Sequence, residues 1–313
     1  MHWPALDFAA DGETYLSAHL YLQLIGKLPT RLLPWENHGW HVAMKVTPCG
    51  FATRTIALPG KAFSVELDCE ASQVLVHSTG AAAQAIPLAG QSVAALHGAL
   101  TQALGDMGLP APLHGAPNEL PDVVPFAEDD RERAWDADAI RRAHAAFASA
   151  DAVFNRFRAA YLGKSSPSHL FWGSFDLAVT RFSGRRAPPH PGGFPNLPDR
   201  VTREAYSHEV ISAGFWLGGG GVDEAAFYAY AYPSPDGLKE GRVSPETAYW
   251  HGDLGEFVLP YADVAAADDP EDRLLTFLET TYEAAARLMD WPADRTTQRA
   301  AIGSPTQSIP APQ

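Results

Sequence analysis

The sequence predicts an α+β protein built from two similar halves, each an antiparallel sheet flanked by helices. Three observations predict this class. Apolar residues with helical spacing stand before and after each group of predicted strands. Residues 62–69 alternate apolar and polar side chains, which is typical of an antiparallel sheet with one wet face. The order helix, several strands, helix then occurs twice along the chain.

The first half opens with a predicted helix over 14–27, in which Leu16, Leu20 and Leu24 follow helical spacing. Prolines follow this helix directly and are expected to end it. A second helix over 92–104 closes the half, and a glycine follows it. Four strands are predicted between the two helices, over about 40–47, 51–58, 62–69 and 73–78.

A proline-rich segment, 109–135, is predicted to link an N-terminal unit, 1–108, to a C-terminal unit, 136–291. Five prolines and then an acidic run fall between residues 105 and 135. Proline at this density fits neither a helix nor a central strand.

The second half opens with the longest predicted helix, 138–162, with Asp136 or Asp138 as its N-cap. The last helix begins at Asp269, has proline at its first position, and runs to about residue 289. Residues 292–313 are rich in proline, serine, threonine and glutamine and are predicted to be a disordered tail. Four strands are predicted between the helices, over about 169–182, 209–217, 225–232 and 256–260.

The two halves echo each other weakly in sequence. The residues 24–27 before the segment 42–47 parallel 161–164 before 175–180. We interpret this as an internal duplication of one α+β unit; the alternative is that two α+β domains share a common pattern by chance.

Composition excludes several classes of protein. Acidic residues outnumber basic ones 37 to 23, a net charge of −14, which argues against nucleic-acid and anionic-membrane partners. No run of 18 apolar residues could span a bilayer, and the first residues lack the pattern of a signal peptide. Two cysteines cannot form a disulfide framework, so we expect a cytoplasmic protein. The oligomeric state does not follow from the sequence.

Charge sets one segment apart from the rest of the chain. Between residues 181 and 204 five arginines oppose two acids, inside a connection without periodicity. Loops this long tend to be lids, binding loops or disordered segments, and a solvated structural loop is the alternative. Because guanidinium groups suit carboxylates and phosphates, we expect Arg181 and Arg185 to hold a small anionic ligand. The alternative is that these arginines pair with the acidic surface around them.

Alternation along two strands predicts the walls of a site. Trp172 and Asp176 share one face of the strand 169–182, and Tyr228 and Tyr230 share a face of 225–232. If these strands are neighbours, they form an aromatic, hydroxyl-lined concavity that holds Asp176. Structural cross-strand aromatic packing is the alternative.

Histidines gather in the same region. His169, His190, His208 and Glu209 are predicted as ligands of a divalent transition metal such as zinc, iron or copper. Their spacing matches no strong metal signature, and each could instead be a hydrogen-bonded or surface residue. A metal-free alternative makes His169 or His208 a general base beside Asp176 or Glu204.

Several motifs resemble those of a bacterial family known as domain-of-unknown-function family number 5996. The resemblance extends to about residue 290 and has no established activity to transfer; it implies a bacterial protein with its signature residues in the region predicted above. The motifs that carry it are Asn37-His38-Gly39-Trp40-His41, Gly163-Lys164-Ser165-Ser166-Pro167, residues 171–178, Pro188-Pro189-His190-Pro191-Gly192-Gly193 and Tyr206-Ser207-His208-Glu209.

These observations favour an enzyme that acts on a small anionic substrate in a cleft lined by residues 163–232, with metal assistance as an option. Asp176, His169 and His208 are the predicted catalytic residues. Arg181, Arg185, Trp172, Tyr228 and Tyr230 are the predicted substrate-binding residues. The alternative is a non-catalytic protein that binds a small molecule or a peptide in the same cleft.

Overall fold

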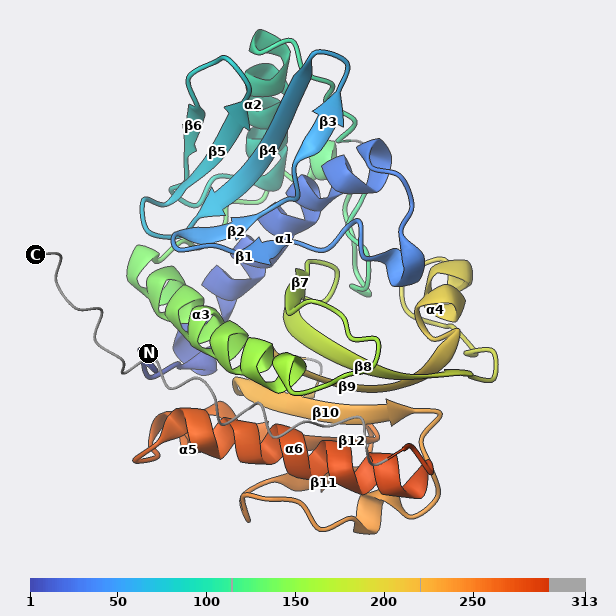
Figure 1. Cartoon of the computed structure of the whole chain (residues 1–313). Helices are drawn as coiled ribbons and strands as arrows, with labels where there is room; N and C mark the ends of the chain where they lie inside the picture. Colours follow the sequence, from blue (N-terminus) through green and yellow to red (C-terminus); the bar gives the residue numbers. More distant parts are fainter. Residues whose placement is uncertain (114, 220, 293–313) are drawn as a thin grey trace, which may run out of the picture.

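Two antiparallel sheets of six strands each, with helices between and beside them, make up the computed structural model, which describes residues 1–113, 115–219 and 221–292 (Figure 1). The predicted α+β class is therefore confirmed. The predicted tail lies outside the described residues from residue 293 on. None of the helices in the described part of the chain combines the length and the apolarity that crossing a membrane requires.

The first sheet has the order β1-β2-β4-β5-β6, and β3 pairs with β4 beside β2. Helix α1 (Phe8–Leu32) precedes this sheet, and α2 (Val93–Asp106) follows it. Its strands are β1 (Lys45–Val46), β2 (Gly50–Ala52), β3 (Ile56–Leu58), β4 (Lys61–Asp68), β5 (Gln73–Ser78) and β6 (Gln84–Pro87).

The second sheet has the order β11-β12-β10-β9-β8-β7. Helix α3 (Ala137–Ala159) precedes it, α4 (Asp199–Ala205) joins β8 to β9, and α5 (Tyr261–Ala265) and α6 (Pro270–Leu288) follow it. Its strands are β7 (His169–Phe171), β8 (Asp176–Arg186), β9 (His208–Trp216), β10 (Ala226–Tyr232), β11 (Tyr249–His251) and β12 (Glu256–Pro260).

Helix α1 runs between the two sheets and is buried on most of its surface (Figure 1). It starts earlier than predicted because the Asp7 carboxylate caps the backbone N–H of Ala10 at 3.1 Å. It also continues past Pro29 to Leu32, although Pro29 was expected to stop it. Pro29 lies near the end of the helix, and its carbonyl still accepts a hydrogen bond from the Leu33 N–H at 3.1 Å.

Three predicted strands are shorter or broken. Of residues 40–47, only Lys45–Val46 form a strand, because the preceding Asn37–Gly39 form a 3₁₀ turn, η1. The segment 51–58 divides into β2 and β3 around Thr53, whose side chain accepts the Val65 N–H at 3.0 Å.

The segment 169–182 contains a turn over residues 172–175, which separates β7 from β8. Phe175 has a φ of 54° there, and Phe171 pairs directly with Asp176. The alternation predicted that Trp172 and Asp176 share one strand face. They do not, because Trp172 lies in the turn before β8.

One apolar core joins the two sheets. Phe51 of β2 contacts Phe147 of α3, with ring centroids 5.2 Å apart, and Phe175 before β8, at 6.0 Å. The two sheets also meet through the backbone. Met44, which precedes β1, and Leu170 of β7 exchange backbone hydrogen bonds of 2.8 and 2.9 Å. The predicted division into domains and the predicted internal duplication stay predictions.

Candidate functional site

The second sheet has one face covered by helices and one polar face. Arg181 of β8 points to the helices, where its guanidinium lies over the rings of Phe157 in α3 and Tyr282 in α6. Because side chains alternate along a strand, the even-numbered residues of β8 point the other way. We call the opposite side of the sheet the polar face. Its hydroxyl- and carboxyl-bearing residues are Asp176, Thr180, Ser212, Tyr228, Tyr230 and Glu256, and Gly214, Trp216, Val258, His169 and His208 lie on the same side by register.

Asp176 and Tyr228 meet on the polar face although β9 lies between their strands. The Tyr228 hydroxyl donates to Asp176 Oδ2, and the Ser174 hydroxyl donates to Asp176 Oδ1 at 2.5 Å. The Tyr228 ring crosses β9 at Gly214, where the β-carbon of any other residue would overlap the ring. Burial raises the pKa of Asp176, and the hydrogen bonds from Ser174 and Tyr228 oppose that rise.

A second carboxyl group, that of Glu119, reaches this site from the segment between α2 and α3. Its side chain packs on Gly173, where a β-carbon would overlap the carboxyl group. Glu119 has a φ of 62°, and its N–H donates to the Pro195 carbonyl at 2.8 Å. Burial and the nearby Asp176 raise the pKa of Glu119 to about 7, against the opposing charge of Lys27.

Two further groups have shifted pKa values near these carboxyls. Burial, followed by the charge of Asp176, raises the pKa of Glu256 in β12 to about 7. Burial lowers the pKa of Lys27 in α1 to about 8, and the Lys27 ammonium donates to Asn118 Oδ1 at 2.5 Å. Since perturbed pKa values concentrate at functional sites, this group of ionisable residues marks the polar face as the candidate site.

Helix α1 fixes the two turns that present Asp176 and Glu119. Gln23 Nε2 donates to the Gly173 carbonyl at 3.0 Å and to the Asn118 carbonyl at 2.7 Å, and Gln23 Oε1 accepts the Asn118 N–H at 3.0 Å. His19 Nε2 lies 3.0 Å from the same Gly173 carbonyl. One buried helix therefore sets the relative position of both carboxyl groups.

The loop over residues 187–198 borders the polar face. His190 stacks on Tyr206, with ring centroids 4.7 Å apart, and lies 5.0 Å from Tyr232. The hydroxyls of Tyr206 and Tyr230 are 2.8 Å apart. We call His190, Tyr206, Tyr230 and Tyr232 the aromatic group; it attaches this proline-rich loop to the sheet.

A cluster of nitrogen-bearing side chains lies near the other end of β8. Lys164 Nζ is 2.6 Å from His38 Nε2, and His38 Nδ1 is 3.0 Å from the Ala205 carbonyl. The rings of His38 and His208 are 6.2 Å apart. His169 packs against Trp40 at 6.0 Å, and burial lowers the pKa of His169 to about 4.

Strand register places the three predicted catalytic residues on the same side of the second sheet, with Asp176 at the start of β8 and His208 paired with Arg186 at its end. Asp176 bonds to Tyr228 and Ser174, whereas His208 and His169 lie in a cluster around the contacting rings of His38 and Trp40. Trp172 packs on Gly26 of α1 and donates its indole N–H to the Val42 carbonyl at 2.9 Å, and the Lys27 ammonium lies 5.0 Å from the centre of its ring. Tyr228 and Tyr230 are the predicted residues that join Asp176.

The two predicted anion-binding arginines are held elsewhere. Arg181 is buried on the helix side of the sheet, where its guanidinium donates to the Phe157 carbonyl at 2.5 Å. Arg185 forms an ion pair of 2.8 Å with Glu209 and donates to the Met289 carbonyl. The arrangement of Arg185 matches the alternative in which the arginines pair with nearby acids.

The four predicted metal ligands do not come together. Glu209 accepts hydrogen bonds from Arg185 and from the Trp291 indole, and His190 belongs to the aromatic group. Within residues 1–113, 115–219 and 221–292, no three histidine, cysteine or acidic side chains are grouped so that they could hold a metal ion.

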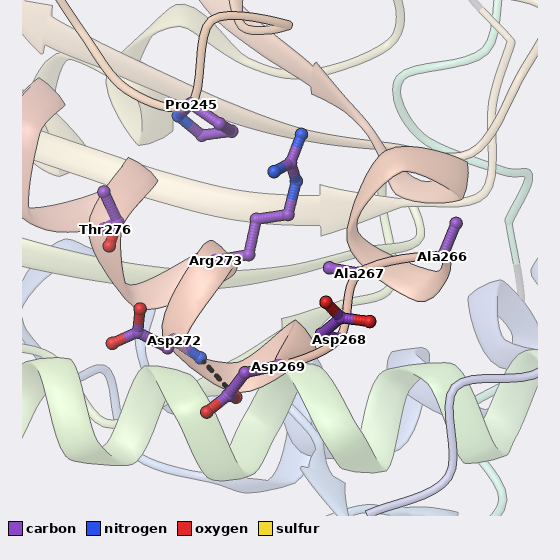
Figure 2. A pocket seen from close by; sticks show the side chains of 8 residues that line it. All are labelled: Pro245, Ala266, Ala267, Asp268, Asp269, Asp272, Arg273 and Thr276. Carbon is purple, nitrogen blue, oxygen red and sulfur yellow. Dashed lines mark hydrogen bonds between the residues drawn. The ribbon is translucent and has the colours of Figure 1, made fainter.

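A surface depression of about 530 Å³ lies at the junction of α5 and α6, away from these residues. Figure 2 shows Asp269 at the start of α6, where its carboxylate accepts the Asp272 N–H at 3.0 Å, with Arg273 pointing toward Pro245. The depression contains no predicted site residue, and the Asp269 carboxylate is explained by its role as a helix cap.

Sequence reasoning missed Glu119, Lys27 and Glu256. Glu119 falls in the segment interpreted as a linker and carried no motif, and Lys27 was noted only as part of the repeated segment 24–27 and of the family resemblance, not as a site residue. Glu256 opens a strand whose sheet neighbours are not evident from the sequence. The alternation around Tyr228 and Tyr230 was the signal that did indicate the polar face.

Comparison with known proteins gives a family without an activity. A family model described as a family of unknown function, DUF5996, matches residues 3–298. No curated protein and no solved structure matches the chain.

Proposed function

The chain belongs to DUF5996, a family of unknown function, and from the geometry of the polar face we propose that it is an enzyme that acts on a small polar molecule by general acid–base catalysis. The observation that carries the proposal is that the carboxyl groups of Glu119 and Asp176 come together from distant segments of the chain. Gln23 of α1 holds Asn118, which precedes Glu119, and Tyr228 of β10 donates to Asp176.

The two carboxyl groups have unequal surroundings, which suits them to different roles. Burial raises the pKa of Asp176, and the hydrogen bonds that it accepts from two hydroxyl groups, which Glu119 lacks among the contacts described above, oppose that rise. Glu119 accepts its proton more readily because it is buried near the charge of Asp176. With a pKa of about 7, Glu119 can donate or accept a proton near neutral pH. Glu119 is then the general acid–base, and Asp176 orients the substrate or stabilises positive charge that develops on it.

The composition of the polar face favours a substrate that carries hydroxyl or amino groups. Carboxyl groups and the hydroxyls of Thr180, Ser212 and Tyr230 accept and donate hydrogen bonds, and aromatic rings can pack on a sugar-like or amine-bearing compound. The anionic ligand predicted from the sequence stays a prediction. The two arginines expected to bind it, Arg181 and Arg185, contact the Phe157 carbonyl and Glu209 instead.

A mixture of small polar metabolites, incubated with the full chain and followed by mass spectrometry, tests the proposal. We expect one hydroxyl- or amino-bearing compound to be consumed, with at least a ~100-fold loss of rate in Glu119→Gln and in Asp176→Asn. Glu246→Gln, on the exposed surface, is the matched control and keeps the rate. A rate that is unchanged in Glu119→Gln would contradict the proposed role of this carboxyl group.

A non-catalytic binding protein is the second candidate, and the aromatic group favours it. His190, Tyr206 and Tyr232 form a stacked set that can hold a flat ligand without chemistry. In that case a compound is retained by the protein and recovered unchanged, and Tyr206→Ala weakens its binding while Glu119→Gln does not.

A further inference from the structure

Lys164 and His38 form a second site, separate from the carboxyl groups of the polar face. We propose that Lys164 is a nucleophilic amine, that His38 is the base that accepts its proton, and that the site takes a small aldehyde or ketone. Four features of the geometry support the proposal, and it does not depend on the proposed acid–base site.

The tautomer of His38 follows from its partners. His38 Nδ1 is 3.0 Å from the Ala205 carbonyl, which can only accept, so Nδ1 must donate. Nε2 of the neutral ring is therefore an acceptor, and Lys164 Nζ, 2.6 Å away, donates to it. A nucleophile beside a base that a third group orients is the arrangement that activates a side chain for covalent catalysis.

The surroundings of Lys164 lack the carboxylate that would keep an amine charged. Among the described residues, no carboxylate oxygen lies within 4.0 Å of Lys164 Nζ. The rings of Trp40 and Phe182 flank the amine, with centroids 5.2 and 4.8 Å from Nζ. Burial lowers the pKa of Lys164, and burial followed by the charges of Lys164 and His208 lowers the pKa of His38.

Access and backbone geometry also fit a reactive site. Lys164 is exposed at the surface, while His38, which its amine contacts, is buried. His38 has φ 62° and ψ 18°, a left-handed conformation that is uncommon for residues other than glycine and that recurs at functional sites.

The proposed step balances without an oxidant or reductant. Lys164 Nζ loses a proton to His38 Nε2 and attacks the carbonyl carbon, forming a C–N bond. The attacking nitrogen gives a second proton to the carbonyl oxygen, which becomes a hydroxyl; this hydroxyl takes the proton held by His38 and leaves as water. The product is a protonated imine between Lys164 and the carbon skeleton, and its hydrolysis regenerates the ammonium group.

The chain contains five lysines, which makes a selective test straightforward: Lys27, Lys45, Lys61, Lys164 and Lys239. Lys45 is the internal standard, because it is exposed on β1. The full chain is treated with acetaldehyde and cyanoborohydride at pH 7, and the alkylation of each lysine is timed by peptide mass spectrometry. We expect Lys164 to react at least ~10-fold faster than Lys45, because His38 accepts a proton from its amine and general-base assistance raises rates by about that factor or more.

Two variants show whether His38 is responsible. His38→Asn tolerates the left-handed backbone, and it should reduce the rate at Lys164 to that of Lys45. His77→Asn, on β5 of the other sheet, is the matched control and should leave the ratio unchanged. Thermal melts confirm that both variants fold. Equal rates at Lys164 and Lys45 in the parent protein, or a ratio that survives His38→Asn, would overturn the proposal.

Discussion

Tyr228 and Asp176 form a hydrogen bond across a strand that belongs to neither of them. The two residues lie on β10 and β8, and Gly214 of β9 leaves the space through which the tyrosine side chain passes. The Tyr228 hydroxyl can reach the buried Asp176 carboxyl group only because Gly214, between them, has no side chain. This dependence gives the first predictions.

Gly214→Ala should displace the Tyr228 ring and separate it from Asp176. Forcing extra volume into a packed site costs about 1–3 kcal/mol, so we expect the free energy of unfolding to fall by that amount. Gly98→Ala is the matched control: it lies within α2, nothing would touch the new methyl group within 4 Å, and it should stabilise the helix by up to ~1 kcal/mol. Urea unfolding measures both, and equal effects would contradict the proposed crossing.

Tyr228→Phe tests the hydrogen bond without changing the packing. Asp176 would lose a donor while it stays buried, which should cost about 1–3 kcal/mol at neutral pH. Tyr232→Phe removes a hydroxyl that donates to the exposed Pro188 carbonyl at 3.0 Å, and it should change the free energy of unfolding by less than ~0.5 kcal/mol. Urea unfolding of both variants in one buffer measures the two free energies of unfolding. Equal losses would contradict the prediction.

The pH dependence of stability should report Glu119 and Glu256. Their pKa values are raised in the folded protein from 4.5 to about 7, so the folded state binds more protons than the unfolded state between these limits. Their contribution to the free energy of unfolding is therefore most favourable below about pH 4.5, falls as the pH rises to about 7, and is then constant.

Glutamine at either position should flatten this slope, because it does not titrate. Unfolding curves of Glu119→Gln and Glu256→Gln between pH 4 and 8 measure the change, and Glu246→Gln on the exposed surface is the control. A slope that both glutamine variants share with the parent protein would mean that these carboxyl groups titrate normally in the fold.

The fold was more predictable than the site for a physical reason. Periodicity is a local signal, and it located the long helix at 138–162, where α3 spans Ala137–Ala159, and the strand at 62–69, where β4 spans Lys61–Asp68. The site instead depends on contacts between distant segments: Gln23 bonds to Asn118, 95 residues away. No periodicity encodes such a contact.

One error could have been avoided from the sequence alone. Side chains alternate along β8, so residues 176 and 181, which are five apart, must lie on opposite faces. The prediction placed the Asp176 carboxyl and the Arg181 guanidinium in one cleft because both stood in the same dense region of unusual residues. The turn at 172–175 contains Gly173 and Ser174, which are common in turns, but the aromatic residues on both sides led to the prediction of one continuous strand.

The position of Arg181 gives the last prediction. Its guanidinium is almost fully buried, donates to the Phe157 carbonyl and lies over two aromatic rings, and burial lowers its pKa to about 10. Lysine cannot reproduce this planar contact, and its more strongly hydrated ammonium costs more to bury. Arg181→Lys should therefore lower the free energy of unfolding by about 2–4 kcal/mol.

Arg181→Lys should also leave the ionisation of the polar face unchanged, because the sheet separates the two sides. Carbon-13 NMR titration of labelled glutamate side chains measures the pKa of Glu119 and of Glu256 in the variant at a temperature where it is fully folded. Arg203→Lys, whose guanidinium makes an exposed ion pair of 3.2 Å with Asp199, is the matched control and should keep the stability within ~0.5 kcal/mol. A large change in the glutamate titrations of Arg181→Lys would show that Arg181 acts on the polar face after all, and it would restore the anion-binding role that the sequence predicted.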